Sequence, residues 1–159
     1  MGATNIPDEV KEAWDILAEI TDLLGEISQW AGSEADTAIT ELHGKWHELC
    51  SNTETARSRK FIDECTKLLA ECDSFRAEIV EKSQSFAVNT KDKVSMIAEL
   101  ARDSEETRSL LEEIFKLWNE VEQPRLVFLY NDTAELESSI MEMMELAVRP
   151  IETATETTK

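Results

Sequence analysis

The sequence predicts an all-α protein, either an antiparallel four-helix bundle or an elongated, coiled-coil-like bundle of long helices. Four glycines and three prolines in 159 residues are too few for the closely spaced turns of a β-rich fold, since ordinary usage is about 7% and about 5%. Apolar residues also recur at intervals of three and four, the period of one helix face. We expect a single domain over residues 1–150 and a disordered tail, rich in Thr and Glu, over 151–159.

The first predicted helix begins near Pro7 and ends at Gly32. Asp8 in its first turn favours the positive end of the helix dipole. Gly32 suits the position that follows a helix C-terminus, and Ser33 can cap the next helix. The apolar face of this first helix consists of Ala13, Ile16, Leu17, Ile20, Leu23, Leu24, Ile27 and Trp30.

The segment from residue 34 to residue 86 carries two apolar stretches with a polar one between them. The first stretch is Ala35, Ala38, Ile39, Leu42, Trp46 and Leu49, and the second is the heptad pattern Phe61, Cys65, Leu68, Cys72, Phe75 and Ile79. We favour one long helix, because Ala56, Arg57 and Arg59 between the stretches are good helix formers. The alternative is two helices joined near Ser51–Thr53, where a polar side chain can cap the second.

Two further helix breaks are predicted in the second half of the chain. At Ala87–Thr90 a polar side chain can cap a new helix, whose apolar positions are Val94, Ile97, Ala98, Ala101, Leu111, Ile114, Phe115, Trp118 and Val121. Pro124 disfavours helical Gln123 and can open the last helix, which we expect to end at Arg149–Pro150. That helix carries Leu126, Leu129, Thr133, Leu136, Ile140, Met143 and Ala147. Four apolar faces of this length predict the four-helix arrangement.

The chain is strongly acidic. It has 16 Lys and Arg residues against 34 Asp and Glu, a formal net charge of −18. Such a surface repels nucleic-acid phosphates and anionic lipids, so we expect no direct nucleic-acid binding. Membrane insertion is not expected either, because the longest apolar run, Leu126–Tyr130, is far shorter than the roughly 20 residues that span a bilayer.

The cysteines predict buried free thiols in a reducing compartment. Cys65 and Cys72 are seven positions apart, about 10.5 Å along a helix, which is too far for a disulfide bond. The N-terminal segment Met1–Pro7 lacks the basic and apolar regions of a signal peptide. We therefore expect a cytoplasmic protein.

The candidate metal-ligating residues are His43, His47 and Cys50. They stand at positions i, i+4 and i+7 of one helix face, and imidazole and thiolate are zinc ligands. The HExxH order is absent, and Thr40 and Gly44 occupy the positions where Glu-x-x-His pairs need glutamate. We therefore expect these residues to flank the core, with no metal or cofactor bound. Without a glycine-rich phosphate loop, and with only two histidines to serve as a base, we expect no enzyme.

One local pattern lies at the predicted turn between the first two helices. Trp30-x-Gly32 stands at the turn, and Lys45–Trp46 follows one helix later. This pattern resembles the WXG family of helical-hairpin proteins that are exported by type VII secretion. The resemblance covers residues 10–80 and implies a secreted, effector-like hairpin. The chain departs from the family in its length and its three cysteines. It also has Ala134 where the export motif after Tyr130 would need an acidic residue.

The expected function is protein–protein interaction by a non-enzymatic acidic bundle, as a scaffold, adaptor or assembly subunit. Its partner would be selected by charge and by an apolar helix groove. Apolar surface left over on the long helix would form a homodimer or receive a partner helix. The alternatives are the exported hairpin and an acidic nucleic-acid mimic that inhibits a basic nucleic-acid-binding protein.

Overall fold

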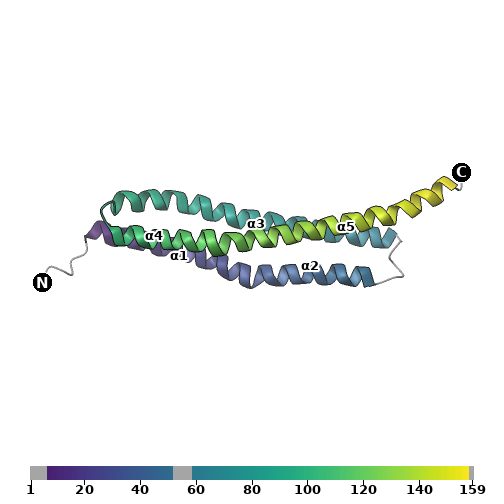
Figure 1. The fold of residues 1–159 in the computed structure, drawn as a ribbon, viewed down its shortest axis with the longest axis horizontal. Helices are drawn as coiled ribbons and strands as arrows, with labels where there is room; N and C mark the ends of the chain where they lie inside the picture. Colours follow the sequence, from purple (N-terminus) through teal and green to yellow (C-terminus); the bar gives the residue numbers. More distant parts are fainter. Residues whose placement is uncertain (1–6, 52–58, 158–159) are drawn as a thin grey trace. The chain divides into compact units, whose positions relative to one another are not determined.

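The computed structural model describes residues 7–51 and 59–157, and all regular structure in these ranges is helical (Figure 1). The elements are α1 (Asp8–Gly32), α2 (Glu34–Ser51), α3 (Arg59–Leu100), α4 (Glu105–Leu117), the π-helix η2 (Trp118–Glu122) and α5 (Gln123–Thr157). The prediction of an all-α helical bundle is confirmed. The predicted four-helix bundle is wrong, because the helices form three long runs, over 8–51, 59–100 and 105–157.

The contacts within the chain divide into two units. Unit 1 comprises Met1–Gly32 and Val80–Val127, and unit 2 comprises Ser33–Ile79 and Phe128–Lys159. Unit 1 therefore contains α1, the C-terminal half of α3, and α4 with η2. Unit 2 contains α2, the N-terminal half of α3 and most of α5. The single domain expected over residues 1–150 stays a prediction, because α3 and α5 each contribute residues to both units.

The helix break at Gly32–Ser33 is confirmed, although its geometry differs from the expected one. Gly32 is the last residue of α1, and only Ser33 separates it from α2. No described glycine has a positive φ. The Thr37 N–H already donates to the carbonyl of Ser33 at 3.0 Å, so α2 starts at once. An interruption of one residue needs no left-handed glycine.

Residues 34–86 form two helices, so the single long helix that the sequence favoured is wrong. Lys45 Nζ lies 2.8 Å from Glu71 Oε1, whereas 26 residues of one α-helix would separate the two positions by about 39 Å. Leu49 lies beside Phe61 in the same part of unit 2, so α2 and α3 run antiparallel there. The predicted joint at Ser51–Thr53 falls mainly on residues outside the described ranges.

The helix break predicted at Ala87–Thr90 is wrong, because α3 continues to Leu100. Thr90 is buried, and its hydroxyl donates to the carbonyl of Phe86 at 2.7 Å instead of capping a new helix. The turn lies at residues 101–104. There Ser104 caps α4, and its Oγ accepts from the Thr107 N–H at 3.2 Å.

The end predicted before Pro124 is also wrong, because η2 carries the helix through this position. The Gln123 N–H donates to the carbonyl of Trp118, an i→i−5 bond of π type. In a regular α-helix the proline ring would collide with the carbonyl four residues earlier, and the wider π turn moves that carbonyl away. α5 likewise runs past Arg149–Pro150 to Thr157, so that predicted end is wrong; disorder over 151–159 stays a prediction.

Candidate interaction surfaces

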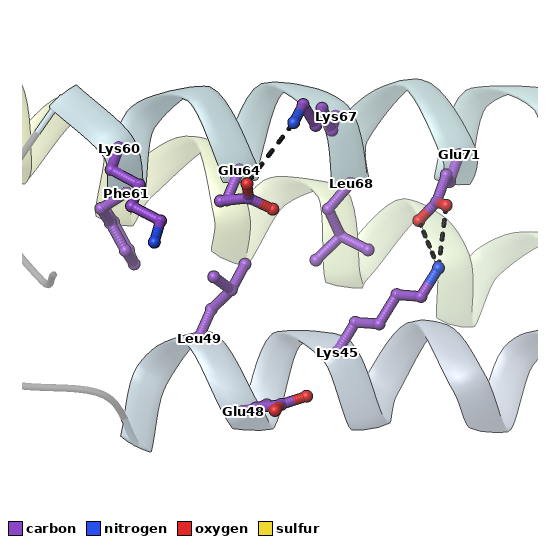
Figure 2. A pocket seen from close by; sticks show the side chains of 9 residues that line it. All are labelled: Lys45, Glu48, Leu49, Lys60, Phe61, Glu64, Lys67, Leu68 and Glu71. Atoms are coloured by element: carbon purple, nitrogen blue, oxygen red, sulfur yellow. Dashed lines mark hydrogen bonds and ion pairs between the residues drawn. The ribbon is translucent and has the colours of Figure 1, made fainter.

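Unit 2 contains a groove of approximately 480 Å³ between α2 and the N-terminal part of α3 (Figure 2). Leu49 and Leu68 point into the space between the two helices, and Lys45 reaches across it to Glu71. The groove therefore has an apolar floor and a charged rim. Its lining residues are Lys45, Glu48, Leu49, Lys60, Phe61, Glu64, Lys67, Leu68 and Glu71.

The charges of this groove balance, which is unusual in a chain of net charge −18. Its lining holds three lysines and three glutamates. Lys45 Nζ donates to both carboxylate oxygens of Glu71, at 2.8 and 3.1 Å, and this hydrogen bond raises the pKa of Lys45. Lys67 pairs with Glu64 at 3.5 Å. The described residues that line the groove include no histidine, serine or cysteine.

The candidate ligands His43, His47 and Cys50 are all exposed on α2. His43 Nε2 lies 2.8 Å from Asp132 Oδ2 of α5, so one ring nitrogen is already engaged. Within the described ranges, no group of three or more His, Cys, Asp or Glu side chains is placed to hold a metal ion. The expectation that the chain binds no metal stays a prediction.

A polar cluster joins α3 to α5 inside unit 2. The guanidinium of Arg76 donates to both carboxylate oxygens of Glu137, with 2.8 Å between Nη2 and Oε2. It also donates to the Tyr130 hydroxyl at 3.2 Å and lies 5.4 Å from the centre of that ring. The hydrogen bond with Glu137 raises the pKa of Arg76. Charge-assisted bidentate pairs of this kind fix geometry, so we assign the cluster a structural role.

The three cysteines are free thiols, as predicted, but the expectation that they are buried is wrong for Cys50. Cys65 and Cys72 are fully buried in unit 2, and burial raises the pKa of each to about 11. Cys50 is exposed, and partial desolvation raises its pKa as well. A thiol reacts as the thiolate, so the two buried cysteines are structural apolar residues in the folded protein.

Unit 1 leaves large apolar side chains of α4 and η2 in solvent. Leu110, Leu117 and Val121 are 40%, 52% and 50% exposed, and Ile114 between them is half-buried. Steps of seven and four place them on one helix face. Val121 was expected on the apolar face of its helix, and that face is exposed at this position. Sequence reasoning missed Leu110 and Leu117, because the wide apolar arc of α4 does not show which part is covered.

Glu122 in η2 is the buried polar residue that sequence reasoning missed. It is 7% exposed, and its Oε2 has no hydrogen-bond partner among the described residues. One turn earlier, the Trp118 ring stacks on Phe86 with 4.2 Å between the ring centres. From its residue type alone, a glutamate is expected to face solvent. The π turn in which Glu122 lies has no simple sequence signal.

No family model, curated protein or solved structure matches this chain. The resemblance to the WXG family therefore rests only on the residues quoted in the sequence analysis. Within unit 1, α1 packs on α4 and η2. None of the described helices combines the length and apolar content needed to cross a lipid bilayer.

Proposed function

We propose that this chain is a non-enzymatic, acidic helical-bundle protein that mediates protein–protein interaction as a scaffold, adaptor or assembly subunit. The observation that carries the proposal is the exposed apolar row Leu110, Leu117 and Val121 on α4 and η2. The row follows one helix face for about 16 Å. Single exposed apolar residues are ordinary on protein surfaces, but a contiguous row indicates an interaction site.

Charge supplies the selectivity in this proposal. Glu106 and Glu113 are exposed next to the apolar row, and the whole chain carries a net charge of −18. Charges around an apolar contact raise association rates and exclude partners of the same sign. The partner is therefore a protein with a basic surface. Because all three cysteines are free thiols, we place the interaction in the reducing cytoplasm.

Site-specific photo-crosslinking in extract of the source cells tests this function. A photoreactive amino acid replaces Leu117, and a matched control replaces Asn119, which is exposed on the other side of the helix. We expect a discrete protein adduct at position 117 and none at position 119. If neither position yields an adduct, or both yield the same ones, the proposed function is wrong.

A second function, mimicry of nucleic acid, is favoured by the high negative charge alone. A mimic occupies the nucleic-acid site of a basic protein, so excess duplex DNA would compete with it and its affinity would fall steeply with salt. The adduct at position 117 distinguishes the two functions. Loss of the adduct in excess duplex DNA indicates a mimic, and its persistence indicates an adaptor.

A further inference from the structure

Unit 1 exposes a surface made by two neighbouring helices, which we call the α1–α4 face. The side chains on its α1 side are small, and those on its α4 side are large. The residues that form it are Ala18, Thr21 and Gly25 of α1, and Leu110, Leu117 and Val121 of α4 and η2.

Two contacts, one with α4 and one with the first turn of α5, show that α1 runs parallel to the helical run that begins with α4 and η2. Trp14 Nε1 donates to Thr107 Oγ1 at 2.9 Å, and a methyl group on Gly32 would lie 3.1 Å from Arg125 Nη2. Both pairs are 93 positions apart in the sequence. The register is therefore constant, and the row from residue 110 to residue 121 lies level with residues 17–28 of α1.

The same contacts show which sides of the two helices meet. Ala18, Thr21 and Gly25 come four, seven and eleven positions after Trp14, so they share its side of α1. Leu110 and Leu117 come three and ten positions after Thr107, so they lie on or beside its side of α4. All five residues are exposed, and they consequently border the α1–α4 contact on its solvent side.

The small residues leave open space beside the apolar row. A Cβ atom added to Gly25 would meet no heavy atom within 4 Å. The α4 side, in contrast, carries leucine and valine side chains that are about half exposed. A low helix surface next to a ridge of large side chains is the shape into which another helix packs. A fourth helix would complete a four-helix arrangement in unit 1.

Carboxylates follow both edges of the α1–α4 face. Glu106 and Glu113 are exposed along its α4 edge, and Asp15 and Asp22 are exposed along its α1 edge. Lys11 stands at the N-terminal end of the α1 edge, and Lys116 is exposed on the α4 edge, three positions after Glu113. An occupant with Lys or Arg on both flanks would meet opposite charges along most of this length.

We propose that the α1–α4 face binds one amphipathic helix of a partner protein. The apolar side chains of that helix repeat at i, i+4, i+7 and i+11, and its flanks are basic. This inference rests on the proposed function and names the partner's chemistry. A second copy of the chain fits less well, because a two-fold interface sets the same patch against itself and would bring these carboxylates together.

Two synthetic helical peptides test the proposal, with identical apolar positions and either lysine or glutamate on their flanks. Fluorescence anisotropy measures their binding to the full chain at low and moderate salt. We expect the basic peptide to bind at least about tenfold more tightly than the acidic one, with affinity that decreases as salt increases. Equal affinity of the two peptides would overturn the proposal.

Variants of the full chain locate the binding surface. Leu117→Gln is expected to weaken binding of the basic peptide at least about tenfold. Val88→Gln is the matched control, because Val88 is 69% exposed on α3, and it should leave Kd within about twofold. Gly25→Trp should weaken binding of the basic peptide, because the indole ring would cover the α1 side of the face. Gly44→Trp should leave binding unchanged, although the surroundings of Gly44 on α2 are equally open. Circular dichroism verifies that each variant folds, and unchanged binding by folded Leu117→Gln overturns the proposal.

Failure of this proposal can be told apart from failure of the proposed function. If the adduct at position 117 forms but the basic peptide does not bind, the interaction function stands and the partner helix is wrong. If sedimentation shows a dimer that Leu117→Gln dissociates, a second copy occupies the face and the proposal is overturned. If position 117 forms no adduct, the proposed function itself fails.

Discussion

The apolar side chains of α3 in unit 2 and those of α4 in unit 1 are covered to different extents. In unit 2 the heptad positions of α3 from Phe61 to Ile79 are at most 5% exposed, and Ile140 of α5 is 0% exposed. In unit 1 the only fully buried residue of α4 is Thr107. The apolar positions of α3 form a narrow stripe that two neighbouring helices can cover. Those of α4 and η2 include adjacent pairs such as Leu110–Leu111 and Leu117–Trp118, which spread over a wider arc. The apolar stripe of α3 in unit 2 is thus covered, whereas α4 in unit 1 leaves an apolar row in solvent. Apolar side chains of α5 in unit 2 are also exposed, namely Phe128, Met141, Met143 and Leu146.

Thiol labelling gives the largest expected contrast. At neutral pH we expect Cys50 to react at least about a thousandfold faster than Cys65 and Cys72, because the buried thiols are protonated and become accessible only when unit 2 opens. Mass spectrometry counts the labels, and Cys50→Ser should remove the fast one. Fast labelling of three thiols in the native protein would contradict the closed core of unit 2.

The same thiols predict a dependence of stability on alkaline pH. In the unfolded chain they ionise near their ordinary pKa of 9.0, and in the folded chain only near 11. Between these values the unfolded state holds fewer protons, so the free energy of unfolding should fall as the pH rises from about 9 to about 11. Urea denaturation measures it, and the fall should be smaller in the Cys65→Ala/Cys72→Ala double variant.

Truncation of core and surface residues compares the packing of the two units directly. Ile140→Ala in unit 2 should lower the free energy of unfolding by about 3–4 kcal/mol, because it leaves a cavity in a fully buried site. Leu117→Ala in unit 1 should change it by less than about 0.5 kcal/mol. Urea denaturation of both variants tests the difference, and similar losses would show that the α4 row is packed after all.

The Arg76–Glu137 pair should contribute less than the apolar core of unit 2. Arg76→Met leaves the carboxylate of Glu137 without its partner, and we expect a loss of about 2 kcal/mol. The double variant Arg76→Met/Glu137→Met should recover most of that loss, since replacing both partners removes the unpaired, partly buried charge. A double variant less stable than either single variant would show that the cluster is irreplaceable.

The smallest expected effect concerns the open α1 side of unit 1. Gly25→Ala should stabilise the chain by up to about 1 kcal/mol, because alanine favours helix and its methyl group meets open space. Gly32→Ala should gain less, since its methyl group lies 3.1 Å from Arg125. Thermal unfolding of the two variants measures this difference in stability. A destabilised Gly25→Ala variant would mean that this side of α1 is covered.

Several features of the fold could be predicted from the sequence because they depend on local periodicity. The helix from Asp8 to Gly32 is one example, and the buried heptad of α3 is another. The site was harder to predict. The sequence pointed to His43, His47 and Cys50, which lie exposed on α2, and it did not identify the apolar row of α4. Periodicity shows that a helix has an apolar face, but coverage of that face depends on its neighbours.

By itself, the sequence determined that the chain is helical, acidic and apolar on one face of each helix, since these properties belong to composition and to the 3.6-residue period. Only the tertiary structure decided where the later helices end and how many runs they form. Cap signals are worth about 1 kcal/mol and an interior proline about 3 kcal/mol, and packing can outweigh both. Thr90 is buried inside α3 instead of starting a helix, and the π turn at Trp118 carries the chain past Pro124. The described helices form three runs because the turn at residues 101–104 and the separation of α2 from α3 replace these two breaks, and only Ser33 interrupts the first run.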